Sequence, residues 1–174
     1  MYKLRELERK DMPIVNLWRR DSELIHFLGS PFRYINSDVD DKFFDSYMSS
    51  RDNTIRCAIV SDNSDVIIGL VTLANINHFN QSAVLHIMIG EKNNQDKGIG
   101  TFALTTMLDH AFYNMNLHRI ELDVLAYNER AIHLYEKVGF KREGTRRKAV
   151  YKNGDFVDMH FYAILKDEYK GRQL

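Results

Sequence analysis

One glycine-rich segment of the chain has the residue types and the setting of an anion-binding site. It reads Gln95-Asp96-Lys97-Gly98-Ile99-Gly100-Thr101 and lies between an apolar run at residues 83–89 and a stretch with helical spacing of apolar side chains. Glycines let backbone N–H groups approach a phosphate, and the free N–H groups and dipole of a helix N-terminus favour negative charge. Lys97 adds a mobile cation. The segment predicts phosphate binding, although a glycine turn that merely opens a helix has the same pattern.

The same glycines formally match a dinucleotide-binding fingerprint that ends in Ala103, with Asp123 at a suitable distance for a ribose. In that fold the first glycine follows its strand almost at once, whereas residues 91–97, all polar or charged, intervene here. The chain also lacks the repeated strand-helix units of a doubly wound sheet. We therefore do not adopt this interpretation.

A second informative segment reads Asn128-Glu129-Arg130-Ala131-Ile132-His133-Leu134-Tyr135-Glu136-Lys137-Val138-Gly139-Phe140. Together with residues 95–100, it resembles the Gcn5-related N-acetyltransferase superfamily. The coenzyme A motif of that superfamily has Gln or Arg, two residues, Gly, one residue, then Gly or Ala, and its downstream helix reads Asn, two residues, Ala, an apolar residue, Tyr and a Gly-Phe ending. Residues 75–144 and the Asn153-Gly154 hairpin look like the branch with ribosomal-protein N-terminal and spermidine or diamine acetyltransferases. Residues 24–50, which usually help to build the acceptor pocket, are the least family-like.

The resemblance implies one α+β domain over residues 1–174, layered α/β/α, with helices flanking a mixed, mostly antiparallel central sheet. Its two middle strands, at residues 83–89 and 119–125, would splay apart and admit the thioester of acetyl-CoA, the cosubstrate. Backbone groups of Ile87, Met88 and Ile89 would pair with the pantetheine amides like an added strand. The pyrophosphate would lie on the N–H groups of residues 95–101.

The resemblance also implies that Tyr135, a phenol with an ordinary pKa of about 10, is the general acid that protonates the departing thiolate. From the residues alone, an aromatic side chain packed on the sheet is the simpler interpretation. Asn128 would contact the pantetheine arm, or serve only as a helix N-cap. Arg130 and Lys137 would reach the 3′-phosphate or pyrophosphate, unless they are simply solvated.

The proton acceptor is less clearly indicated, because many members of the superfamily carry glutamate where this chain has Val84. His86 lies two residues on, hence on the same strand face, and an ordinary histidine pKa of about 6.5 suits a base. Glu121 and Asp123 on the neighbouring strand are further candidates. A buried structural histidine and a chain of waters remain alternatives. The histidines show no metal-ligand spacing, so no metal is expected.

The rest of the chain predicts the elements that position these segments. Apolar periodicity predicts helices at residues 14–28, with a break near 19–22, and at 37–50. The run at 83–89 predicts a strand covered on both faces. The Asn153-Gly154 pair predicts a hairpin turn. Strands are expected at residues 2–7, 54–60, 66–75, 83–89, 119–125, 146–152 and 156–165.

Composition limits the class of protein and its partners. The chain has 174 residues with 44% hydrophobic and 28% charged residues, which fits one globular domain. Lys plus Arg equals Asp plus Glu at 24 each, so neither nucleic acid nor a membrane is an expected partner. The chain shows neither a secretory signal nor a long apolar stretch, which predicts a cytoplasmic protein.

The acceptor amine is left open between a polyamine, a peptide N-terminus and an amino sugar. The carboxylates of Asp38, Asp40, Asp41 and Asp45 would suit a polyamine pocket, or form a solvated helix face. The rival interpretation is an acyl-CoA-binding sensor or interaction module without turnover. Homodimers are common in such families, but no residue specifies an interface.

Overall fold

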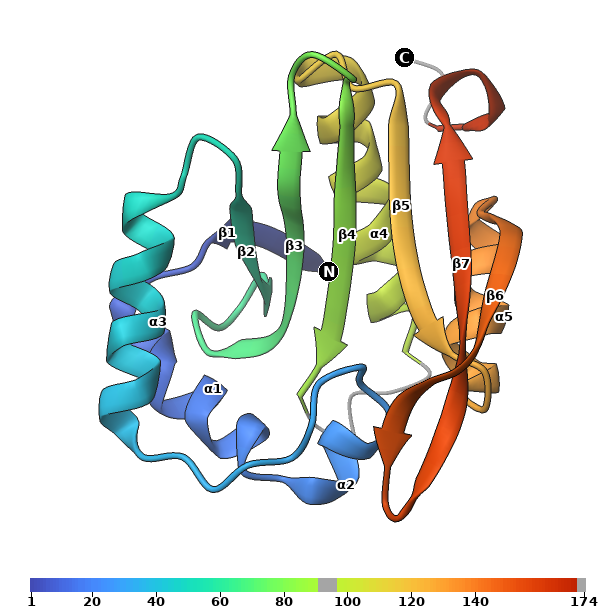
Figure 1. The fold of residues 1–174 in the computed structure, drawn as a ribbon. Helices are drawn as coiled ribbons and strands as arrows, with labels where there is room; N and C mark the ends of the chain where they lie inside the picture. Colours follow the sequence, from blue (N-terminus) through green and yellow to red (C-terminus); the bar gives the residue numbers. More distant parts are fainter. Residues whose placement is uncertain (91–96, 172–174) are drawn as a thin grey trace.

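The computed structural model describes residues 1–90 and 97–171. They form a seven-stranded sheet with the order β1-β2-β3-β4-β5-β7-β6 (Figure 1). Neighbouring strands are antiparallel except β4 and β5, which are parallel. The strands are β1 (Tyr2–Glu6), β2 (Ile55–Ser61), β3 (Ile67–Asn77), β4 (Ser82–Ile89), β5 (Arg119–Leu125), β6 (Lys141–Lys152) and β7 (Asp155–Leu165).

The predicted N-terminal helix is broken in two, and the break lies where the sequence indicated it. The side chain of Asp21 accepts hydrogen bonds from the backbone N–H groups of Glu23 and Leu24 and so caps a new short helix. None of the described helices is long and apolar enough to cross a membrane. The helices are α1 (Met12–Arg19), α2 (Ser22–His26), α3 (Ser37–Ser49), α4 (Ile99–Asp109), which continues as a π-helical turn (His110–Asn114), and α5 (Glu129–Val138).

Two apolar cores lie on the two faces of the sheet, because alternate residues of a strand point to opposite sides. Ile59 packs in the core that includes α4, whereas its neighbours Ala58 and Val60 pack in the core that includes α1 and α3. Since α1 and α3 cover mainly the β1–β3 side, they leave much of β4 and β5 uncovered. The expectation that the central strand is covered on both faces is therefore wrong, and His86 is exposed.

The two middle strands diverge, as the sequence predicted. Residues Ser82, Ala83 and Val84 pair with Arg119, Ile120 and Glu121, and the pairing then ends although both strands continue. Figure 1 shows the far ends of β4 and β5 separated. We call the space between residues 85–89 and residues 122–125 the wedge. On the face opposite α4, His86 and Asp123 are the first residues beyond the last pair, and we call this side the open face.

The end of β4 is fixed by close packing with α1. A Cβ atom added to Gly90 would lie 1.8 Å from Cε2 of Trp18, a ring that is only 5% exposed. Glycine is therefore required for this approach. It lets α1, and hence the start of α2, lie beside the point where β4 ends.

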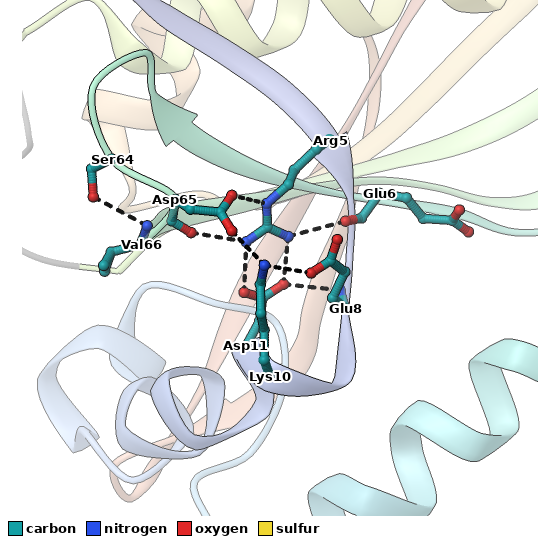
Figure 2. Close-up of polar contacts among 8 residues, drawn as sticks. All are labelled: Arg5, Glu6, Glu8, Lys10, Asp11, Ser64, Asp65 and Val66. Atoms are coloured by element: carbon teal, nitrogen blue, oxygen red, sulfur yellow. Dashed lines mark hydrogen bonds and ion pairs between the residues drawn. The ribbon is translucent and has the colours of Figure 1, made fainter.

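A closed ion-pair network joins β1 to the turn between β2 and β3 (Figure 2). The guanidinium of Arg5 donates to both carboxylate oxygens of Asp11, at 2.7 and 2.8 Å, and to Asp65 at 2.8 Å. Its remaining N–H groups donate to the carbonyls of Glu6 and Asp65. The hydrogen bonds to Asp11 are the main cause that raises the pKa of Arg5 above its usual value. This network holds the N-terminal strand and the start of α1 on the sheet.

Candidate active site

A cavity of about 630 Å³ lies where the end of β4, the first turn of α4, α2 and α5 meet. The predicted coenzyme residues come together on its walls, although they are separate in the sequence. Lys97 is exposed and is not among the lining residues. Gln95 and Asp96 lie outside the described residues. The predicted residues that line the cavity are Ile87, Met88, Ile89, Gly98, Ile99, Gly100, Thr101, Asn128, Arg130 and Lys137.

The first turn of α4 supplies the anion-binding geometry. Gly98 has φ of 76°, a left-handed conformation that suits glycine, and no side chain caps the helix. The first N–H groups of a helix have no partner within the helix. Residues 98–101 line the cavity, so these N–H groups of α4 lie at the cavity wall and no side chain caps them. A Cβ on Gly100 would lie 2.7 Å from Cδ2 of Leu134, so glycine also allows α4 to start against α5.

The edge of β4 is open toward the wedge at the same place. Ile87 and Met88 pair with Val71 and Leu70 of β3 on one side, whereas the pairing with β5 has already ended at Val84. Backbone N–H and C=O groups on the wedge side of residues 87–89 therefore have no strand partner. A ligand with amide groups can pair with such an edge as an added strand.

Asn128 serves two structural purposes in this cavity wall. Its side-chain oxygen accepts from the backbone N–H of Ala131 at 3.2 Å and caps α5. Its amide nitrogen donates to the carbonyl of Phe27 at 3.1 Å. The N-cap expected from the sequence is present, and the same side chain joins α5 to the end of α2.

Side chains from the C-terminal half of the chain hold the carbonyl end of α2, and we call this set the carbonyl clamp. Lys152 donates to the carbonyl of Ile25 at 2.9 Å and also to that of Ser30. Tyr127 donates to the carbonyl of His26, and Asn128 to that of the next residue. Lys152 is 6% exposed, and burial lowers the pKa of its ammonium group. The clamp satisfies carbonyls that a helix end leaves unpaired.

Replacement of Lys152 by methionine is expected to raise the KM for acetyl-CoA roughly 10-fold with little change in kcat. The reason is that a charged hydrogen-bond donor is lost from the carbonyl end of α2, which is one wall of the cavity. Initial rates at saturating amine, together with the Kd for acetyl-CoA from calorimetry, measure the effect. Lys3→Met, at an exposed position of β1, is the matched control. An unchanged KM and Kd in Lys152→Met would show that the carbonyl clamp does not maintain the cavity wall formed by α2.

Tyr135 does not line the cavity but lies in the adjacent core, 7% exposed and edge-on to Phe140. Burial raises the pKa of its phenol to about 12, so the group keeps its proton at neutral pH. Within residues 1–90 and 97–171 its hydroxyl forms no hydrogen bond. A protonated, unengaged phenol has the state that a general acid requires.

His86 and Glu121 differ in their readiness to accept a proton. Desolvation lowers the pKa of His86, the positive charge of Arg56 lowers it further, and Asp123 raises it. Its imidazole is therefore neutral at pH 7 and able to accept a proton. The carboxylate of Glu121, by contrast, accepts from Arg119 at 2.7 Å. Of the two candidates, His86 has the free basic nitrogen.

Three of the four aspartates of α3 pair with cations of the same chain. Asp40 is 1% exposed and accepts from Arg19 and Asn16. Asp41 and Asp45 both lie against Arg9. Since cations of the same chain neutralise these three carboxylates, they are not available to select a polyamine.

The sequence did not indicate which side chains of α2 and its ends line the cavity. The capping aspartate at the helix break is the one local signal of a turn there, and no motif marks the side chains that follow it. The lining residues from this region are Asp21, Glu23, Leu24, Phe27 and Leu28. The last three belong to residues 24–50, the least family-like part of the chain.

A family model described as "Acetyltransferase (GNAT) domain" matches residues 2–141 of the chain. The chain belongs to the GNAT acetyltransferase family. It is 33% identical to spermidine N(1)-acetyltransferase of Vibrio cholerae over 97% of this chain and 95% of that one. It is 32% identical to the Escherichia coli K12 enzyme of the same name, over 96% and 87%. This GNAT protein is therefore an acyltransferase that moves the acetyl group of acetyl-CoA to an amine.

The solved structures agree with this assignment. The crystal structure of the Vibrio cholerae spermidine N-acetyltransferase in complex with CoA and spermine superposes with a TM-score of 0.90. The two chains are 28% identical, and 97% of each is covered. The fold of this GNAT chain is thus a single α+β domain of the family over nearly all of its length.

Proposed function

We propose that the acceptor amine attacks the thioester carbon directly, within the wedge, while coenzyme A occupies the cavity. A C–N bond forms as the C–S bond breaks. The sulfur takes the phenolic proton of Tyr135, and His86 takes a proton from the nitrogen, which becomes more acidic as it is acylated. Residues 1–174 act as one catalytic domain in this proposal.

The observation that carries the proposal is the convergence of an open strand edge and a helix N-terminus in one cavity. The edge at residues 87–89 offers backbone groups to the pantetheine amides, and the first turn of α4 offers N–H groups to the pyrophosphate. Arg130 and Lys137 on α5 supply cations on the same cavity wall. The thioester end then points to the place where β4 and β5 separate.

Replacement of His86 by glutamine is expected to lower kcat about 100-fold, the effect of losing a positioned proton acceptor. Because desolvation lowers the pKa of His86, kcat of the native protein should fall on acidification with a midpoint below about 6.5. The variant should lose that acid limb. The measurement is kcat against pH at saturating substrates. A variant that keeps both the rate and the acid limb would exclude His86 as the acceptor.

The acceptor class is tested by release of free thiol from acetyl-CoA with spermidine, glucosamine and a peptide with a free N-terminus. Relatives named for spermidine make a polyamine the first compound to test. Asp21 and Glu23 are the carboxylates on the cavity wall. Tight binding of acetyl-CoA without thiol release by any amine would favour the acyl-CoA sensor over an enzyme.

A further inference from the structure

Arg56 on β2 carries a guanidinium that has no carboxylate partner among residues 1–90 and 97–171. It lies over the rings of Phe43, at 4.6 Å, and Tyr47, at 5.7 Å. Its Nε is a buried side-chain nitrogen with no hydrogen-bond partner among the described residues. Burial lowers its pKa, because no nearby anion compensates the desolvation. A buried polar group left in this state calls for an explanation.

Several other arginines of this chain are paired with carboxylates. Arg5 donates to two aspartates, Arg19 to Asp40, and Arg119 to Glu121 and Glu143. The chain thus has carboxylates to neutralise its structural guanidinium groups. Arg56 is different, since its charge is balanced by ring contacts alone within the part of the chain that the structure describes.

The position of Arg56 relates this charge to the reaction. Arg56 is paired with Thr72 of β3, and Thr72 is paired with His86 of β4, so all three side chains belong to one row on one face. On this side of the sheet α3 covers Arg56, and Thr72 is 4% exposed, whereas His86 lies on the open face, where β4 and β5 separate. Two strand steps of roughly 4.8 Å each place the backbones of Arg56 and His86 about 10 Å apart.

We infer that Arg56 is an anion-recognition subsite of the acceptor, and that the acceptor amine carries a carboxylate or phosphate within about 10 Å of its reacting nitrogen. This inference rests on the proposed function, in which the nitrogen lies at His86. A guanidinium presents paired N–H donors that match either anion. An extended polyammonium ion would meet an uncompensated like charge there.

The test uses amines matched in pairs, with and without the anion. The pairs are O-phosphoethanolamine with ethanolamine, glucosamine 6-phosphate with glucosamine, and phenylalanine with phenethylamine, and spermidine is measured beside them. The native protein is expected to show a kcat/KM at least 10-fold higher for the anionic member of one or more pairs. The phosphate pairs and the carboxylate pair distinguish the two anions.

Arg56→Met is expected to lose about 10–100-fold in kcat/KM on the preferred anionic amine and to change little on its partner without the anion. Arg56→Lys, which keeps the charge, should recover part of the loss. The Kd for acetyl-CoA should be unchanged in both variants, which a general structural defect would not allow. Arg51→Met, at an exposed arginine that pairs with Glu6, is the matched control and should keep the native preference.

Equal kcat/KM within every pair, an equal loss on both members in Arg56→Met, or a preference for spermidine would overturn the inference while leaving amine acetylation intact. Absence of thiol release with every amine would instead contradict the proposed function. In that case, calorimetry of the acetyl-CoA-loaded protein with O-phosphoethanolamine, glucosamine 6-phosphate and phenylalanine decides. If none of these compounds binds, or if they bind equally well to Arg56→Met, the inference of an anion subsite is overturned.

Discussion

Replacement of Tyr135 by phenylalanine is expected to lower kcat by about 10²–10⁴-fold, the range found for loss of a general acid. The substitution removes one oxygen from a side chain whose hydroxyl makes no hydrogen bond within the described residues, so the packing should survive. Since burial raises the pKa of this phenol to about 12, it remains protonated and able to serve the thiolate throughout the neutral range. Thiol release at saturating substrates measures kcat.

Tyr162→Phe is the matched control for this prediction. Tyr162 is 2% exposed and donates to Glu136 at 2.9 Å, so the substitution removes a hydroxyl with a purely structural bond from a comparably buried tyrosine. Its kcat should stay within a few-fold of native. The Kd for acetyl-CoA should be native in both variants. A native kcat in Tyr135→Phe, or an equal loss in both, would contradict the assignment of Tyr135 as the acid.

Replacement of Arg5 by alanine is expected to lower the free energy of unfolding by about 3–5 kcal/mol. The side chain of Asp11 is only 4% exposed, and Arg5 donates to both of its oxygens. Without the guanidinium, a buried carboxylate loses its countercharge, which costs more than the pair itself contributes. Urea unfolding followed by circular dichroism measures the loss.

Lys10→Met is the control, because it removes a second cation from the same network (Figure 2). Lys10 binds Asp65 and Glu8, but its side chain is 55% exposed, and water screens such pairs. Its unfolding curve should nearly coincide with that of the native protein. Equal stability of Arg5→Ala and Lys10→Met would show that the network does not hold β1 in place.

Much of the fold was predictable because its signals are local. The break between α1 and α2 and the start of α4 after Gly98 follow from capping and glycine chemistry. Gly139 has φ of 112° at the end of α5, a conformation that suits glycine. Asn153 and Gly154 both have positive φ between β6 and β7, in the hairpin turn that the sequence predicted. The prediction that β4 is covered on both faces was wrong, because an apolar run indicates that side chains are buried but not which helix covers each face.

The sequence by itself determined most of the elements, since periodicity, caps and glycine positions act over a few residues, and its resemblance to the superfamily implied the splayed sheet and the residues that meet at the cavity. Only the tertiary structure decided which charges meet. Asp40 is neutralised by Arg19, Glu121 is held by Arg119, and Arg56 is left without a carboxylate. The clamp joins Lys152 to a carbonyl 127 residues away. Such contacts depend on how segments that are distant in the sequence pack together, and no local sequence pattern indicates that packing.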